Sequence, residues 1–137
     1  MAGSATVTAS SDNPAAGQDA TRATDGIIDG YPGDYTREWA TNGGGAGSWL
    51  NLAWTNPVTL DRVVLYDRPN TADQITAATL TFSDGTTVPV PTLNNTGTAT
   101  TITFPARTTT TLRLTITTVT GTTINIGLAE LQTLTPN

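Results

Sequence analysis

The side chains that most often carry out catalysis are missing from this sequence. It contains no histidine and no cysteine, and all six of its basic residues are arginine. Histidine is the commonest general base and metal ligand, so its absence excludes serine–histidine and cysteine–histidine mechanisms. Without cysteine there is also no disulfide and no thiol chemistry. The chemistry that remains is that of carboxylates, arginine, amides and tyrosine, and these groups gather in three places.

The first place is an irregular segment near the start of the chain. Residues 12–47 lack a strand pattern and include Asp25, Asp29 and Asp34. Such a segment is too long for a simple connection in a compact domain, and a hard cation is one way to order it. The spacing of these acids does not fit a twelve-residue EF-hand loop. A cation site here would therefore be assembled from distant parts of the chain.

Glu130 is a candidate for the distant part. It lies in the stretch NIGLAELQTL, residues 125–134, which has the pattern of a β-strand. A carboxylate on a strand that also buries Leu128 and Leu131 loses several kcal/mol of hydration unless it is paired or bound to a metal. The alternatives to a metal site are that Glu130 faces solvent, or that it pairs with Arg22 or Arg37.

The second place is the loop YDRPNTADQ, residues 66–74, which follows a strongly strand-like segment. The loop contains arginine, aspartate and asparagine, whose planar polar side chains bind sugar hydroxyls well. It is therefore suited to binding carbohydrate. An equally acceptable interpretation is that Arg68 and Asp67 pair with each other and only shape the turn. The candidate ligand contacts in the loop are Asp67, Arg68, Asn70, Asp73 and Gln74.

The third place is the segment GYPGDY, which contains Tyr31 and Tyr35. Two aromatic rings in a loop rich in glycine and proline have no core to pack into, and this indicates a binding surface. An exposed ring can stack on the apolar face of a sugar.

The elements that must position these residues are short strands. Apolar and polar residues alternate in many segments, and only residues 17–26 have the pattern of a helical turn. Ser83-Asp84-Gly85 supplies the turn of a hairpin. About eight strands with little helix predict a single all-β domain, a sandwich or a barrel. The expected strands occupy residues 4–10, 48–54, 58–67, 75–90 (the hairpin), 98–105, 108–120 and 125–134.

The charge of the chain argues against polyanionic partners. Its formal net charge is −5, and the six arginines are scattered. Nucleic acids and anionic membranes are bound mainly by clusters of basic residues. We therefore expect no nucleic-acid partner, and a membrane partner is disfavoured.

Several of these segments, in this order, resemble the coagulation factor V/VIII type C, or discoidin-like, domains. The resemblance rests on RATDGIIDG, EWAT, WLNLAW, VVLYDRPN, LTFSDG and NIGLAELQTL, and it covers about residues 5–134. It implies a jelly-roll β-sandwich of the galactose-binding type, a fold shared with many carbohydrate-binding modules. It also implies that Trp39 is a core residue.

The resemblance further implies a structural calcium ion. Carried onto this chain, the carboxylate ligands are Asp25 and Glu130, and carbonyl ligands are expected from Arg22 and Ala129. Asp29 and Thr36 are further candidates from the same loop. In sugar-binding relatives an arginine after the corresponding strand contacts the ligand, which here is Arg68. Arg68→Ala is expected to abolish sugar binding without changing the melting temperature.

The resulting hypothesis is a non-catalytic carbohydrate-binding module. It would hold a secreted, bacterial, glycan-active parent protein on a polysaccharide or glycoconjugate. The alternative is a discoidin-type adhesion domain that binds a protein or membrane surface. An enzyme is disfavoured, because Asp25 and Glu130 are assigned to a metal and the other acids show no pairing for glycoside cleavage.

Overall fold

The structure is a computed structural model that describes residues 2–29, 33–69, 72–94 and 96–136. Within these residues, eight strands and four short 3₁₀ helices follow one another. In order they are η1 (Ala2–Ser4), β1 (Thr6–Ala9), η2 (Pro14–Ala16), η3 (Ala20–Thr24), η4 (Tyr35–Arg37), β2 (Trp39–Ala40), β3 (Trp49–Tyr66), β4 (Ile75–Phe82), β5 (Thr87–Val90), β6 (Thr100–Val119), β7 (Gly127–Leu128) and β8 (Glu130–Leu134).

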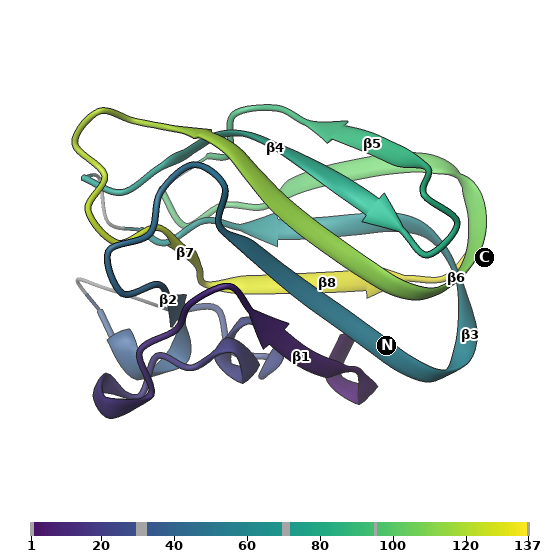
Figure 1. Cartoon of the computed structure of the whole chain (residues 1–137), viewed down its shortest axis with the longest axis horizontal. Coiled ribbons are helices and arrows are strands. Elements are labelled where there is room, and N and C mark those ends of the chain that lie inside the picture. The colour runs from purple at the N-terminus through teal and green to yellow at the C-terminus, as the bar shows by residue number, and fades with distance from the viewer. Residues whose placement is uncertain (1, 30–32, 70–71, 95, 137) are drawn as a thin grey trace.

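Two long strands, β3 and β6, belong to both layers of the sandwich. The first part of β3 pairs with β1 and with the second part of β6, and β4 and β5 extend this layer in the order β1-β3-β6-β4-β5. The last part of β3 pairs with β8 and with the first part of β6. Between these parts the β3–β6 register shifts after Ala53 and after Leu60. The shifts let both strands bend and return, as Figure 1 shows at its right-hand end.

Alternation along the strands builds the core between the layers. In β6, Leu112, Leu114 and Ile116 are buried, whereas Arg113, Thr115 and Thr117, which alternate with them, are exposed or only partly buried. Trp39 is fully buried, and its indole N–H donates to the carbonyl of Ser11 at 2.8 Å. The all-β sandwich predicted from the sequence is confirmed, and Trp39 is a core residue as the resemblance implied.

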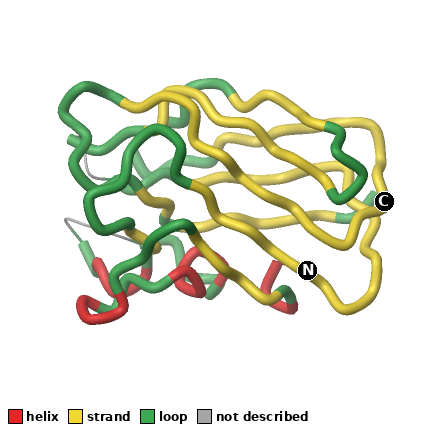
Figure 2. Tube along the Cα trace, viewed as in Figure 1, coloured by secondary structure: helices red, strands yellow, loops and turns green. Residues whose placement is uncertain are grey.

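The helical turns gather along one edge of the molecule, beside β1 (Figure 2). The loops that follow β3 and precede β7 lie with η4 at one end of the sandwich, whereas both ends of the chain lie in the opposite half, with the C-terminus at its edge (Figure 1). No helix in the described part of the chain is long and apolar enough to cross a membrane.

Candidate functional site

Arg68 follows the end of β3 and lies at the centre of a buried polar cluster. Only 5% of its side chain is exposed. Its Nε donates to Oε2 of Glu38 at 2.6 Å, and its Nη2 donates to Oε1 of the same residue at 3.0 Å. Its Nη1 donates to Oδ2 of Asp73 at 3.1 Å and to the backbone carbonyl of Asn125. One guanidinium therefore joins the segments before β2, after β3 and before β7.

The two carboxylates on Arg68 bind further groups. Oε1 of Glu38 also accepts from Nε2 of Gln18 at 2.9 Å. Oδ1 of Asp73 accepts from the backbone N–H of Ile124 at 2.7 Å and from that of Asn125 at 3.4 Å. Hydrogen bonds in which one or both partners are ionised are strong when they are buried. The cluster therefore holds the loop before β7 in place.

Asp67 closes the loop after β3 through the backbone, and not by the side-chain pair with Arg68 that the sequence suggested. Its two oxygens accept from the backbone N–H groups of Arg68 at 2.8 Å and Ile75 at 2.9 Å. The Arg68 guanidinium pairs with Glu38 and Asp73 instead. Burial raises the pKa of Asp67 to about 7, and the two backbone hydrogen bonds oppose this shift. Asp67 thus shapes the turn through the backbone.

Above this cluster lies an open hollow of about 600 Å³. Its residues are Ala16, Gln18, Tyr35, Arg68, Ala72, Asp73, Ile124 and Asn125. Tyr35 is 49% exposed and Ile124 is 70% exposed, so the hollow has an apolar surface beside the polar groups of Gln18 and Asn125. Polar groups held in place next to apolar side chains are what a small polar ligand with one apolar face requires.

The structure brings together several of the residues predicted to bind ligand. Arg68, Asp73 and Tyr35 line the hollow, and Asp67 shapes the adjacent turn. Gln74 does not line it, since its Nε2 donates to the carbonyl of Leu93 at 3.0 Å. Asn70 and Tyr31 lie outside the described residues.

Sequence reasoning missed Glu38, Gln18, Ile124 and Asn125. Glu38 had one usable signal: it directly precedes the core residue Trp39, in a chain whose buried acids have no lysine to pair with. No comparable signal marks Gln18, Ile124 or Asn125, because these residues reach the hollow on irregular loops.

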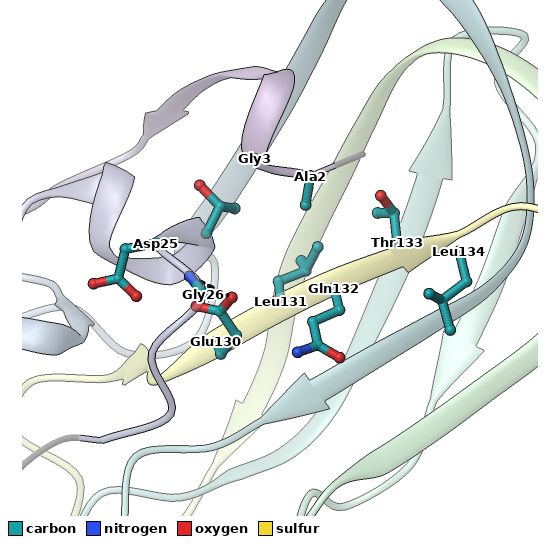
Figure 3. A pocket seen from close by; sticks show the side chains of 10 residues that line it. Ala2, Gly3, Asp25, Gly26, Glu130, Leu131, Gln132, Thr133 and Leu134 are labelled. Atoms are coloured by element: carbon teal, nitrogen blue, oxygen red, sulfur yellow. Dashed lines mark hydrogen bonds between the residues drawn. The ribbon is translucent and has the colours of Figure 1, made fainter.

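A second polar site lies between the end of η3 and the start of β8. Glu130 is 3% exposed, and its Oε2 accepts from the backbone N–H of Gly26 at 3.0 Å. Oδ1 of Asp25 accepts from the N–H of Ile27 at 2.9 Å. The other oxygens, Oδ2 of Asp25 and Oε1 of Glu130, are buried and accept no hydrogen bond from the described residues. Figure 3 shows the two residues facing each other across Gly26, beside a cavity of about 410 Å³.

The electrostatics of this pair are unfavourable. Burial is the main cause that raises the pKa of Glu130 to about 8, and the charge of Asp25 adds to the shift. Glu130 neither faces solvent nor pairs with an arginine, because the ion pairs of the described residues place Arg22 at Asp19 and Arg37 at Asp34. Two buried carboxylate oxygens without partners fit the requirements of a hard cation.

The other predicted metal ligands are distributed unevenly around this pair. Arg22 lies in η3, which packs against β8, and the buried Ala129 directly precedes Glu130. None of these predicted ligands, Arg22, Ala129, Asp29 and Thr36, is among the residues around the cavity, and the Thr36 hydroxyl donates to Asp34 at 2.5 Å. In the described ranges no third acidic residue joins Asp25 and Glu130, so the remaining ligands would be backbone carbonyls.

Comparison with known families gives a match over almost the whole chain. Residues 1–134 match the model of a domain of unknown function, DUF7402. The chain belongs to the DUF7402 family. The matching model is thus not that of the coagulation factor V/VIII type C domains. No curated protein sequence matches this DUF7402 domain.

Solved structures similar to the DUF7402 domain include carbohydrate-binding modules. A chitosan-binding module derived from a chitosanase/glucanase of Paenibacillus sp. IK-5 is 28% identical, with a TM-score of 0.71 over 96% of this chain and 95% of that one. The family 32 module of C. perfringens NanJ, in complex with galactose, is 18% identical, with a TM-score of 0.72 over 95% and 93%. A further Clostridium perfringens module, CpGH89CBM32-5, in complex with GalNAc-beta-1,3-galactose, is 18% identical, with a TM-score of 0.75 over 96% of both chains. The predicted jelly-roll sandwich of the galactose-binding type is confirmed.

Proposed function

We propose that this chain is a non-catalytic carbohydrate-binding module and that the hollow above Arg68 is its binding site. The observation that carries the proposal is the arrangement of exposed Tyr35 and Ile124 beside the amides of Gln18 and Asn125, over a rigid buried cluster. The 28% identity to a chitosan-binding module supports it.

The hollow offers the two kinds of contact that sugar recognition needs. The Tyr35 ring and the Ile124 side chain can cover the apolar face of a pyranose ring. The Asn125 amide nitrogen and the Gln18 amide oxygen can bind its hydroxyl groups, because the hydrogen bonds that these side chains make to described residues use the other amide atom of each. A shallow site with so few contacts gives micromolar to millimolar affinity.

The same geometry argues against hydrolysis in the hollow. Glycoside cleavage needs one carboxylic acid to protonate the leaving group and a second carboxylate to assist. Glu38 and Asp73 are both committed to Arg68, and both are buried. The role that remains is to hold a secreted, glycan-active parent protein on its substrate. The origin of the Paenibacillus module in a chitosanase/glucanase supports this role.

The proposal includes a structural calcium ion at Asp25 and Glu130. The buried oxygens of these two residues that accept no hydrogen bond from the described residues would become ligands, with backbone carbonyls of Arg22 and Ala129 completing the site. Such an ion would neutralise two carboxylates that repel each other and would join η3 to β8. Asp29 and Thr36 stay predicted ligands only.

The test of the sugar site is a glycan array followed by titration calorimetry on the best glycan. Tyr35→Ala and Ile124→Ala each remove an exposed apolar side chain, so we expect at least a tenfold loss of affinity and an unchanged melting temperature. Ile28→Ala is the matched control, because Ile28 is 44% exposed but does not line the hollow.

Three outcomes would count against this function. Unchanged affinity in both variants would move the site elsewhere. Equal losses in the Ile28→Ala control would show a nonspecific effect. Binding to phospholipid vesicles without binding to any glycan would favour the adhesion alternative.

A further inference from the structure

The charges beneath the hollow do not cancel. Two carboxylates, Glu38 and Asp73, face one guanidinium, that of Arg68, and all three side chains are buried. The cluster therefore has a formal charge of −1 in a region that water screens poorly. The net charge of the whole chain, −5, has the same sign.

Arg68 has little capacity left to bind an anion. Its guanidinium has five N–H donors, and it makes four hydrogen bonds to the described residues: two to Glu38, one to Asp73 and one to the carbonyl of Asn125. A carboxylate of a sugar acid prefers two parallel N–H donors of one arginine, and these already bind Glu38. No other basic residue is among the described residues around the hollow.

We propose that the hollow selects glycans built from amino sugars with free, protonated amines, and that it rejects sugar acids. This inference rests on the proposed function, since it concerns the ligand of the same site. The apolar faces of Tyr35 and Ile124 position the sugar ring, while the excess negative charge below attracts an ammonium group at the mouth. The carboxylates lie beneath the surface, so they attract the ammonium group without contacting the sugar ring. This attraction adds selectivity to the ring contacts with Tyr35 and Ile124, which any pyranose can make.

The experiment compares three oligosaccharides of equal length by titration calorimetry: glucosamine oligomers, N-acetylglucosamine oligomers and galacturonate oligomers. Measurements are made at low and at high salt, at a pH where the amines are protonated. We expect glucosamine oligomers to bind about tenfold more tightly than the N-acetylated ones at low salt, and the difference to shrink at high salt. Galacturonate oligomers should not bind.

A matched pair of variants tests the role of charge directly. Ile124→Glu and Ile124→Lys both replace an exposed apolar side chain by a long polar one, so they differ mainly in sign. At low salt the Glu variant should bind glucosamine oligomers about tenfold more tightly than the Lys variant. For N-acetylglucosamine oligomers the two variants should be equal.

The outcomes separate this inference from the proposed function. Tight binding of galacturonate, a preference for a neutral sugar, or equal binding of glucosamine oligomers by the two variants would overturn the amino-sugar inference and leave a carbohydrate-binding module. The absence of binding to any glycan on the array would overturn both.

Discussion

The guanidinium of Arg68 makes hydrogen bonds to three segments that are far apart in the sequence. Glu38, Asp73 and Asn125 come from before β2, after β3 and before β7, and none of these segments is a long strand. The walls of the hollow are therefore held by a side chain where strand pairing is sparse. Arg68 is a positioning residue first, and its contacts with the described residues use four of its five N–H donors.

Substitution of Arg68 should affect stability strongly. Arg68→Ala leaves Glu38 and Asp73 buried without their cation, so we expect a loss of about 3–5 kcal/mol in the free energy of unfolding, measured by urea denaturation. This replaces the expectation from sequence that the melting temperature would not change. Arg113→Ala is the control: Arg113 is exposed and stacks on Trp49, so its loss should cost about 1 kcal/mol or less. Equal effects of the two substitutions would contradict the role of Arg68.

Asp67 should make stability depend on pH. Its pKa rises from 3.8 to about 7 in the folded protein because of burial, so between these values the folded state keeps a proton that the unfolded state has released. Its contribution to stability is complete below about pH 4 and is lost as the pH rises through about 7. Relative to Asp67→Asn, the wild type should lose at most about 1.4 kcal/mol per pH unit in this window. A constant difference in urea denaturation from pH 4 to 8 would refute the shift.

At the scale of elements, the sequence predicted strand positions better than strand continuity. It indicated separate strands at 48–54 and 58–67, and at 98–105 and 108–120, where the structure has the single strands β3 and β6. The exposed run Thr55-Asn56-Pro57 reads as a strand end, yet the β3–β6 ladder resumes at Val58 with a shifted register. Hydrophobic alternation cannot reveal this, because a bulge interrupts the pattern without ending the pairing.

The same limit explains which site residues could be predicted. Glu130 was recognisable because a charge among buried strand residues needs a partner, and Arg68 because it follows a strong strand. Asn125 and Ile124 reach the hollow through backbone hydrogen bonds to Asp73, a contact over about fifty residues that no local pattern encodes.

The short β2–β7 pair depends on a glycine. Gly127 pairs with Ala40, and a Cβ there would overlap the carbonyl oxygen of Trp39 and lie 2.8 Å from the Cα of Ala40. Gly127→Ala should therefore destabilise the domain by at least about 2 kcal/mol, measured by thermal and urea unfolding. Gly121→Ala, where a Cβ meets nothing within 4 Å, should stay within about 0.5 kcal/mol of wild type. Similar stability of the two variants would show that β2 and β7 can separate at little cost.

At the scale of the whole molecule, the proposed calcium ion joins the early irregular segment to the final strand. Gly26 already donates to Glu130 across 104 positions of sequence. An ion shared by Asp25 and Glu130 would strengthen this link between the early segment and β8. In the described part of the chain, no strand pairing joins these two segments.

Calcium should therefore raise the melting temperature. At a hundredfold excess over its dissociation constant, a ligand of the folded state stabilises by about 2.7 kcal/mol, which corresponds to several degrees for a chain of this size. Glu130→Gln should abolish this response. In chelator near neutral pH, that variant should be about as stable as wild type, because burial raises the pKa of Glu130 to about 8 and the amide then replaces a mostly neutral carboxyl group. Identical melting of wild type with calcium and with chelator would exclude the ion.

Both ends of the chain lie in the half of the sandwich opposite the loops that form the hollow (Figure 1). A bead, a tag or a neighbouring domain attached to either terminus would thus sit away from the loops around the hollow and leave the approach to them open. Immobilised polysaccharide could then be reached from the free side whichever terminus serves as the tether.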